Sequence, residues 1–153
     1  MLRSVRREEQ GASMIEVLIT IVVLAIGLLG LAGLQVTSIQ TNYSSYYRSQ
    51  ASVLAYDLSD RMRSNRAAAL GGSYDLDFPT SSDSHSVSGS IAAKDKAEWL
   101  NSLATILPGG TGKVERDDSL IIIHVQWDDT RGQIKRADST DTHTETFIYR
   151  TEI

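Results

Sequence analysis

The feature that most constrains this chain is an apolar run near the N-terminus that begins beside an acidic residue. Residues 17–34 carry no charge, and after Glu16 the next charged residue is Arg48. A helix of this length and composition is long enough to cross most of a bilayer. We therefore expect one membrane-spanning segment here, with lipid of the inner membrane as its first partner.

Three arginines before this run predict its orientation. Arg3, Arg6 and Arg7 precede the run, and the first basic residue after it is Arg48. The positive-inside rule then places the short N-terminus in the cytoplasm and the rest of the chain in the periplasm.

An ordinary secretory signal peptide would show the same pattern, with residues 30–32 as a weak cleavage site. The carboxylate of Glu16 argues against this alternative. Inserting an acid costs about 2.5 to 3.5 kcal/mol at mid-bilayer and less near the interface. Because a simple signal peptide does not need that acid, Glu16 indicates a partner.

Residues 11–17 read GASMIEV and suggest where the partner comes from. If a peptidase cuts between Gly11 and Ala12, the new amino group of Ala12 lies one helical turn (i, i+4) from the carboxylate of Glu16. A new cation would then accompany the acid.

This segment resembles the class III signal of the type IV prepilin family, in which a short charged leader ends in Gly and Glu is the fifth residue of the mature chain. The resemblance implies that prepilin peptidase removes residues 1–11 and that Ala12 becomes N-methylated. It also implies that Glu16 docks against the N-terminal amine of a neighbouring subunit in a filament. The sequence departs from the family pattern at Ala12, where Phe is usual, and at Met14, where Leu is usual.

The apolar segment, residues 12–35, is expected to serve as the membrane-spanning and assembly half of a long helix. Its packing residues are expected to be Val17, Leu18, Ile21, Leu24, Leu28 and Leu31. Residues 36–70 continue with apolar side chains at three- and four-residue steps, which is typical of an amphipathic helix. One helix is therefore predicted from about 13 to 69, ended by Gly71 and Gly72.

Residues 71–153 predict a globular head. A loop rich in Ser and Asp is followed by a helix at about 92–107, whose apolar face carries Trp99, Leu100, Leu103, Ile106 and Leu107. Strands are predicted at 120–127, 133–137 and 142–153, with Ile121, Ile123, Val125 and Trp127 facing the core. The predicted fold class is α+β: a long N-terminal helix packed on a small antiparallel sheet of three or four strands, with a second short helix. The pilin resemblance implies the same architecture.

Three further segments resemble the PilV family of minor pilins, also called type IV pilus modification proteins. They are residues 54–74, LPGG at 107–110 and VQWDD at 125–129. The resemblance implies a low-copy subunit that helps to initiate pilus assembly and joins the pilus tip, supporting adhesion and twitching motility. Its expected partners are prepilin peptidase, other minor pilins, the major pilin and a tip adhesin.

The sequence predicts no enzyme, no cofactor and no metal site. GGTGKV at 109–114 lacks the first Gly and the final Ser or Thr of a phosphate-binding loop. The three histidines are scattered without a second ligand at metal spacing, and Asp128-Asp129 is typical of a turn. With a net charge of -4 and a pI near 5.3, no nucleic-acid partner is expected.

Two other functions remain open. A pseudopilin of a type II secretion system would share the N-terminus but reside beneath the outer membrane. A signal-anchored periplasmic binding domain, from a different class, would keep residues 1–11 and stay in the inner membrane.

Overall fold

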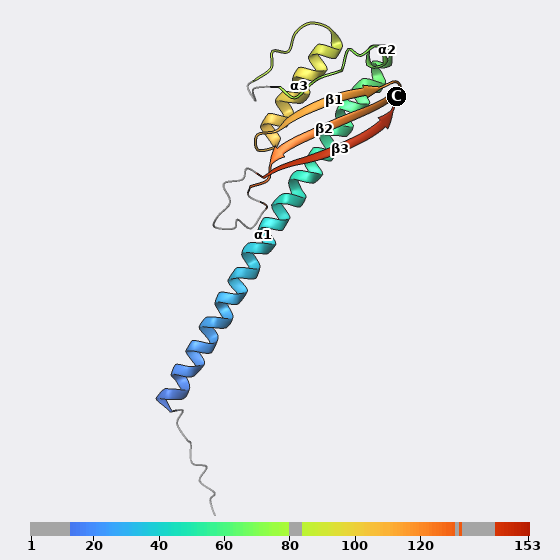
Figure 1. The fold of residues 1–153 in the computed structure, drawn as a ribbon. Coiled ribbons are helices and arrows are strands. Elements are labelled where there is room, and N and C mark those ends of the chain that lie inside the picture. The colour runs from blue at the N-terminus through green and yellow to red at the C-terminus, as the bar shows by residue number, and fades with distance from the viewer. Residues whose placement is uncertain (1–12, 80–83, 131, 133–142) are drawn as a thin grey trace, which may run out of the picture. The chain divides into compact units, whose positions relative to one another are not determined.

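The computed structural model describes residues 13–79, 84–130, 132 and 143–153, so Gly11, Ala12 and the strand predicted at 133–137 lie outside the described residues. The chain divides into two compact units, Met1–Ser38 and Ile39–Ile153. The described elements are α1 (Met14–Ser64), α2 (Arg66–Leu70), α3 (Ile91–Ile106), β1 (Thr111–Asp117), β2 (Leu120–Asp128) and β3 (Thr144–Glu152) (Figure 1). A long helix, a short helix and a three-stranded antiparallel sheet confirm the predicted α+β fold class.

The part of α1 that belongs to the second unit buries one face. The buried side chains recur at three- and four-residue steps: Tyr47, Ala51, Leu54, Ala55, Leu58 and Met62. This spacing places them on one stripe, as the sequence predicted. The earlier part of the predicted stripe behaves differently, because Ile39, Tyr43 and Tyr46 are exposed.

The predicted single helix to residue 69 is interrupted at Asn65. α1 ends at Ser64 and α2 begins at Arg66, and Asn65 between them has φ -120° and ψ 49°. The side-chain amide of Asn65 donates to the hydroxyl of Tyr74 at 3.2 Å. Asn competes for hydrogen bonds outside the helix, which favours an interruption at this position. The predicted stop at Gly71 and Gly72 is confirmed as the end of α2.

The sheet has the order β1-β2-β3, and both pairs are antiparallel. β2 lies in the centre and alternates as predicted, with Ile121, Ile123, Val125 and Trp127 buried. Sequence analysis missed β1, because its residues, TGKVERD, are mostly polar or charged and include only one strongly β-favouring apolar side chain, Val114. The pairing with β2, and not intrinsic propensity, makes this segment a strand.

α3 corresponds to the helix predicted at about 92–107. Its N-cap residue is Ser90, whose hydroxyl accepts from the backbone N–H of Ala93 at 3.2 Å. Trp99, Leu100, Leu103 and Leu107 are buried as expected. Ile106 was expected on the same face but is 39% exposed. The helix ends there, and the chain turns through Leu107 towards β1.

Trp99 joins the layers of the head. Its indole N–H donates to the backbone carbonyl of Leu54 in α1 at 3.0 Å. A Cβ atom at Gly112 of β1 would collide with the indole of Trp99 and crowd Leu103. Gly112, the third glycine of GGTGKV, therefore allows β1 to approach α3 closely.

A polar network ties the end of α1 to α3. The guanidinium of Arg61 contacts Asp57 at 3.0 Å, Asp95 at 3.4 Å and Glu98 at 2.6 Å. The hydrogen bond with Glu98 is the main cause that raises the pKa of Arg61. Tyr74 donates to the other carboxylate oxygen of Asp95 at 2.5 Å. The positive charge of Arg61 is therefore paired within the head.

We predict that Gly112→Ala lowers the free energy of unfolding of the head by about 1–3 kcal/mol, because the added methyl group overpacks the contact with Trp99. The measurement is chemical unfolding in detergent, followed by the fluorescence of the two buried tryptophans. Thr111→Ala, at the neighbouring position, is the control and should shift the midpoint less. An unchanged midpoint for Gly112→Ala would contradict the role assigned to this glycine.

Candidate functional site

The candidate site is the first part of α1. Gly11 and Ala12 lie outside the described residues, and the helix begins just after them at Met14. The backbone carbonyl of Ser13 accepts from the N–H groups of Glu16 at 2.9 Å and Val17 at 3.2 Å. These bonds form the first helical turn, so Glu16 stands in the turn where the helix dipole favours a negative charge.

The carboxylate of Glu16 makes no ion pair and no side-chain hydrogen bond with any residue in the described part of the chain. Only its backbone carbonyl is engaged, accepting from the hydroxyl of Thr20 at 2.7 Å. The helix therefore presents this acid without a partner from residues 13–79, 84–130, 132 or 143–153. A charge at the edge of an apolar segment is stabilised when an opposite charge approaches it.

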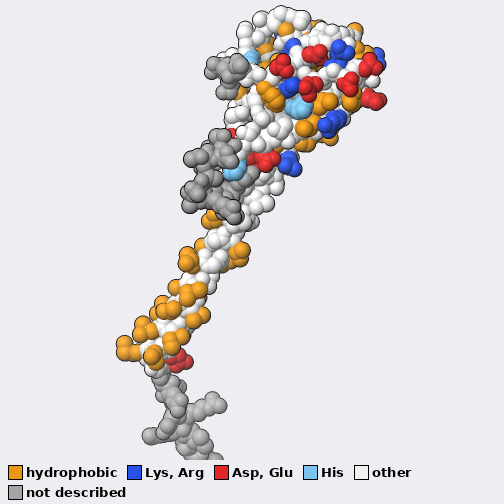
Figure 2. Space-filling model, viewed as in Figure 1, with side chains coloured by type: hydrophobic (Ala, Val, Ile, Leu, Met, Phe, Trp, Pro, Cys, Tyr) orange, Lys and Arg blue, Asp and Glu red, His pale blue; other side chains and the backbone are white. Residues whose placement is uncertain are grey.

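The apolar residues that follow Glu16 are exposed along the helix. The six side chains predicted to pack in assembly are between 47% and 62% exposed: Val17, Leu18, Ile21, Leu24, Leu28 and Leu31. Figure 2 shows hydrophobic side chains along this part of α1, with acidic colour near its start. By length and composition α1 is apolar enough to cross a membrane, and none of its most apolar stretch is buried inside the described chain.

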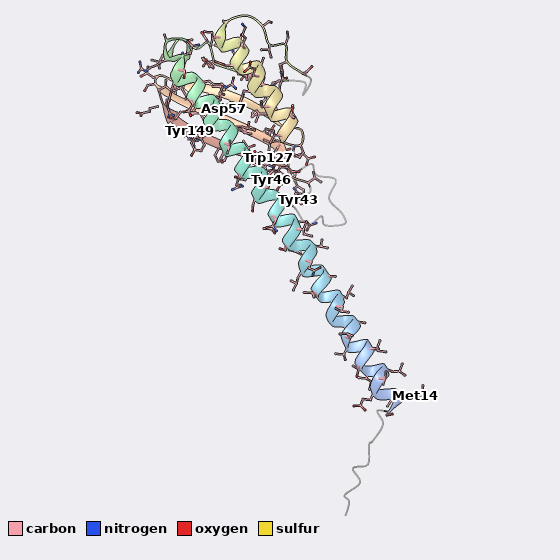
Figure 3. All side chains as sticks on the ribbon, turned by 180° about the vertical axis from the view of Figure 1, so that it is seen from behind. Met14, Tyr43, Tyr46, Asp57, Trp127 and Tyr149 are labelled. Atoms are coloured by element: carbon pink, nitrogen blue, oxygen red, sulfur yellow. The ribbon has the colours of Figure 1, made fainter. Side chains whose placement is uncertain are left out.

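The exposed apolar surface extends beyond the predicted boundary at residue 35. Ile39, Asn42, Tyr43 and Tyr46 line one shallow depression on α1, and the two tyrosines are labelled in Figure 3. Along one face of the helix, exposure falls from 49% at Tyr43 to 8% at Tyr47, one turn later. The hydrophobic period alone could not locate this change, because the same spacing continues on both sides of it.

Among the described residues, the charged face of the head carries several ion pairs. His124 lies 3.0 Å from Glu115, which in turn contacts Lys113 at 2.7 Å. The hydrogen bond from Lys113 is the main cause that lowers the pKa of Glu115. Among the residues that the structure describes, no three His, Cys, Asp or Glu side chains are grouped to hold a metal ion.

The comparison with protein families identifies the N-terminal segment. Residues 6–32 match the family model described as the prokaryotic N-terminal methylation motif. Comparison with curated proteins and with solved structures found no match. The matched region contains Gly11, Ala12, Glu16 and the start of the exposed apolar helix.

This motif marks a prepilin peptidase substrate that assembles with other pilins, and proteins that carry it are typically structural and non-catalytic. Together with the apolar helix, it fits a pilin anchored in the inner membrane. The chain therefore carries a prepilin-type N-terminus, which supports a type IV pilin-like protein, either a pilin or a pseudopilin.

Proposed function

We propose that this protein is a minor pilin, a structural subunit that helps to initiate a type IV pilus and takes a place in its tip. The observation that carries the proposal is the methylation motif continuing into an exposed apolar helix. The proposed partners are prepilin peptidase, the major pilin, other minor pilins and a tip adhesin.

Maturation begins with hydrolysis of the peptide bond between Gly11 and Ala12. The leader, residues 1–11, leaves with a new carboxylate at Gly11, and Ala12 gains an amino group that is then methylated. That amine is positively charged near neutral pH. Residues 12–35 form the membrane and assembly half of the helix, residues 36–70 the amphipathic half, and residues 71–153 the head.

The new amine and Glu16 form the docking pair. Because Glu16 has no partner among the described residues, its carboxylate is available to the Ala12 amine of a neighbouring subunit. In an apolar surrounding such a pair is strongly favoured over two separated charges, and removal of one partner leaves the other charge uncompensated. Val17, Leu18, Ile21, Leu24, Leu28 and Leu31 then exchange lipid contacts for contacts with neighbouring helices.

The assignment to the minor pilins is supported by the segments that resemble the PilV family. Two of them meet in the head: the backbone N–H of Asp128, in VQWDD, donates to the carbonyl of Pro108, in LPGG, at 2.8 Å. The contact holds the end of β2 against the turn that follows α3. Both segments thus contribute to one corner of the fold, next to the buried Trp127.

Two alternatives differ from the minor pilin in whether the chain is processed and in where it is found. A pseudopilin would be processed in the same way but stay out of surface pili. A signal-anchored binding domain would retain residues 1–11. Mass spectrometry of filaments sheared from the cell surface distinguishes them, because the minor pilin yields a peptide that begins at N-methylated Ala12 and ends at Arg48.

We predict that Glu16→Ala leaves membrane insertion and cleavage intact but lowers incorporation into filaments by about tenfold or more, because the docking charge is lost. The measurement is the ratio of the processed chain in sheared filaments to that in membranes. Asp117→Ala, which removes one exposed acid from the head, is the matched control and should incorporate normally. Normal incorporation of Glu16→Ala would refute the docking role.

We predict that Gly11→Asp blocks cleavage, because a charged side chain then occupies the position where the leader must end in Gly. The unprocessed chain would accumulate in the membrane and run larger on a gel by the mass of the leader. Ser4→Asp adds the same charge inside the leader, away from the cleavage site, and should be processed. If Gly11→Asp were also processed normally, cleavage after residue 11 would be excluded.

A further inference from the structure

The two edges of the head's sheet differ. At the β1 edge, Leu76 pairs with Val114 through two backbone hydrogen bonds of 3.0 and 2.8 Å, so part of this edge is closed by the chain itself. At the other edge, β3 pairs only with β2 within the described residues. The far side of β3 therefore presents backbone N–H and C=O groups without a backbone partner in that part of the chain.

β3 lacks several of the features with which proteins usually protect an exposed edge, although Glu145, Arg150 and Glu152 give it charge. Its nine residues pair with β2 in unbroken register, from Leu120 opposite Glu152 to Asp128 opposite Thr144, so no bulge twists the edge away. The strand, TETFIYRTE, contains neither Pro nor Lys and is rich in residues that favour strands. Such an edge is a template for pairing with a further strand.

Residues 48–63 of α1 run beside β3 in the same direction. Three contacts in chain order establish this: Arg48 lies 3.5 Å from Glu145, the rings of Tyr56 and Tyr149 have centroids 4.7 Å apart, and Arg63 donates to the hydroxyl of Thr151 at 2.7 Å. Figure 3 shows Tyr149 close to α1. The contacts come from the face of β3 that points towards the helix.

Beside this line of contacts α1 exposes an apolar pair, Val53 and Tyr56, which we call the β3 ledge. Val53 is 58% exposed, and Tyr56 remains 51% exposed despite its contact with Tyr149. The two residues are three positions apart and so share one face of the helix. A strand added to β3 would extend the sheet beside α1, and its inward side chains would cover this ledge.

We propose that the β3 edge and the β3 ledge bind an extended segment of a different protein chain, which adds to the sheet as a fourth strand. The backbone of β3 would supply the hydrogen bonds, and the ledge would select apolar side chains at alternate positions of the incoming segment. The proposal goes beyond the proposed function, because it identifies a partner surface that the docking of Glu16 does not involve.

A second copy of this chain fits the edge poorly. In the antiparallel pairing that this sheet uses throughout, the β3 strands of two copies would run in opposite directions. Residues 48–63 of α1 run in the same direction as β3, so these residues of the two copies would also run in opposite directions. The two chains would then leave their heads towards opposite sides. Two prepilin-type N-termini anchored in one membrane need to leave towards the same side. This step rests on the proposed membrane anchoring.

The test places a photo-reactive amino acid, p-benzoylphenylalanine, at one position of the full-length chain in cells. Ile148, on the outer face of β3, and Val53, on the ledge, are the two test positions, and Val87, exposed elsewhere on the head, is the control. Ile148 reports on outward side chains of an added strand and Val53 on inward ones. We expect both positions to cross-link to the same short stretch of one other protein, at residues of opposite parity, and Val87 not to reach that stretch.

The second step tests whether the ledge matters. Val53→Lys should lower the cross-link yield from position 148 by about tenfold or more, because a charge would be buried under the incoming strand. Val87→Lys, with the same change at a similarly exposed site, should leave the yield unchanged. Because Val53 is exposed, the head should retain its melting temperature, which is measured for both variants.

Cross-links only to copies of this chain, only to helical segments with i, i+4 spacing, only to lipid, or to nothing would overturn the proposal. Equal yields with Val53→Lys and Val87→Lys would also overturn it. Incorporation into filaments is measured in the same cells, so failure of the added strand is distinguished from failure of the minor pilin function.

Discussion

The head depends on the packing of Trp99 between α1 and β1. Its indole reaches the carbonyl of Leu54 on one side and lies against Gly112 on the other, so one side chain joins a helix, a second helix and an edge strand. A fully buried aromatic side chain removes a large apolar area from water, and the buried N–H finds a partner here. This contact holds α1 against α3, while the contacts of Tyr56 with Tyr149 and of Arg63 with Thr151 hold α1 on β3.

α1 serves two environments with one hydrophobic period. Before Tyr47 its apolar side chains are exposed and suited to lipid or to neighbouring helices. From Tyr47 onward one apolar stripe is buried in the head, while Val53 and Tyr56, off that stripe, stay exposed. The uncharged stretch explains how one helix can do both, because no charge has to be buried between Glu16 and Arg48. At its start Glu16 is the one charged residue, and in the proposed function it gives the helix a specific docking partner as well as an apolar surface.

The accuracy of the sequence predictions followed the strength of the local signals. β2 and α3 were predicted well because strict alternation and helical spacing of large apolar residues are strong signals. β1 was missed because its polar residues form a strand only through pairing with β2. The interruption at Asn65 was not predicted, because a single polar residue rarely breaks a helical pattern. The low helix preference of Asn favours the interruption, and the hydrogen bond to Tyr74 accompanies it. The strand predicted at 133–137 stays a prediction.

The sequence by itself determined the prepilin-type N-terminus, because the methylation motif is defined by spacing along one segment and needs no distant contact. It also determined the fold class, through hydrophobic periods of two different lengths. Only the tertiary structure decided which strand is left at the edge of the sheet and which part of α1 flanks it. Strand order and helix placement depend on contacts between residues far apart in the chain, such as Tyr56 with Tyr149, which no local pattern specifies.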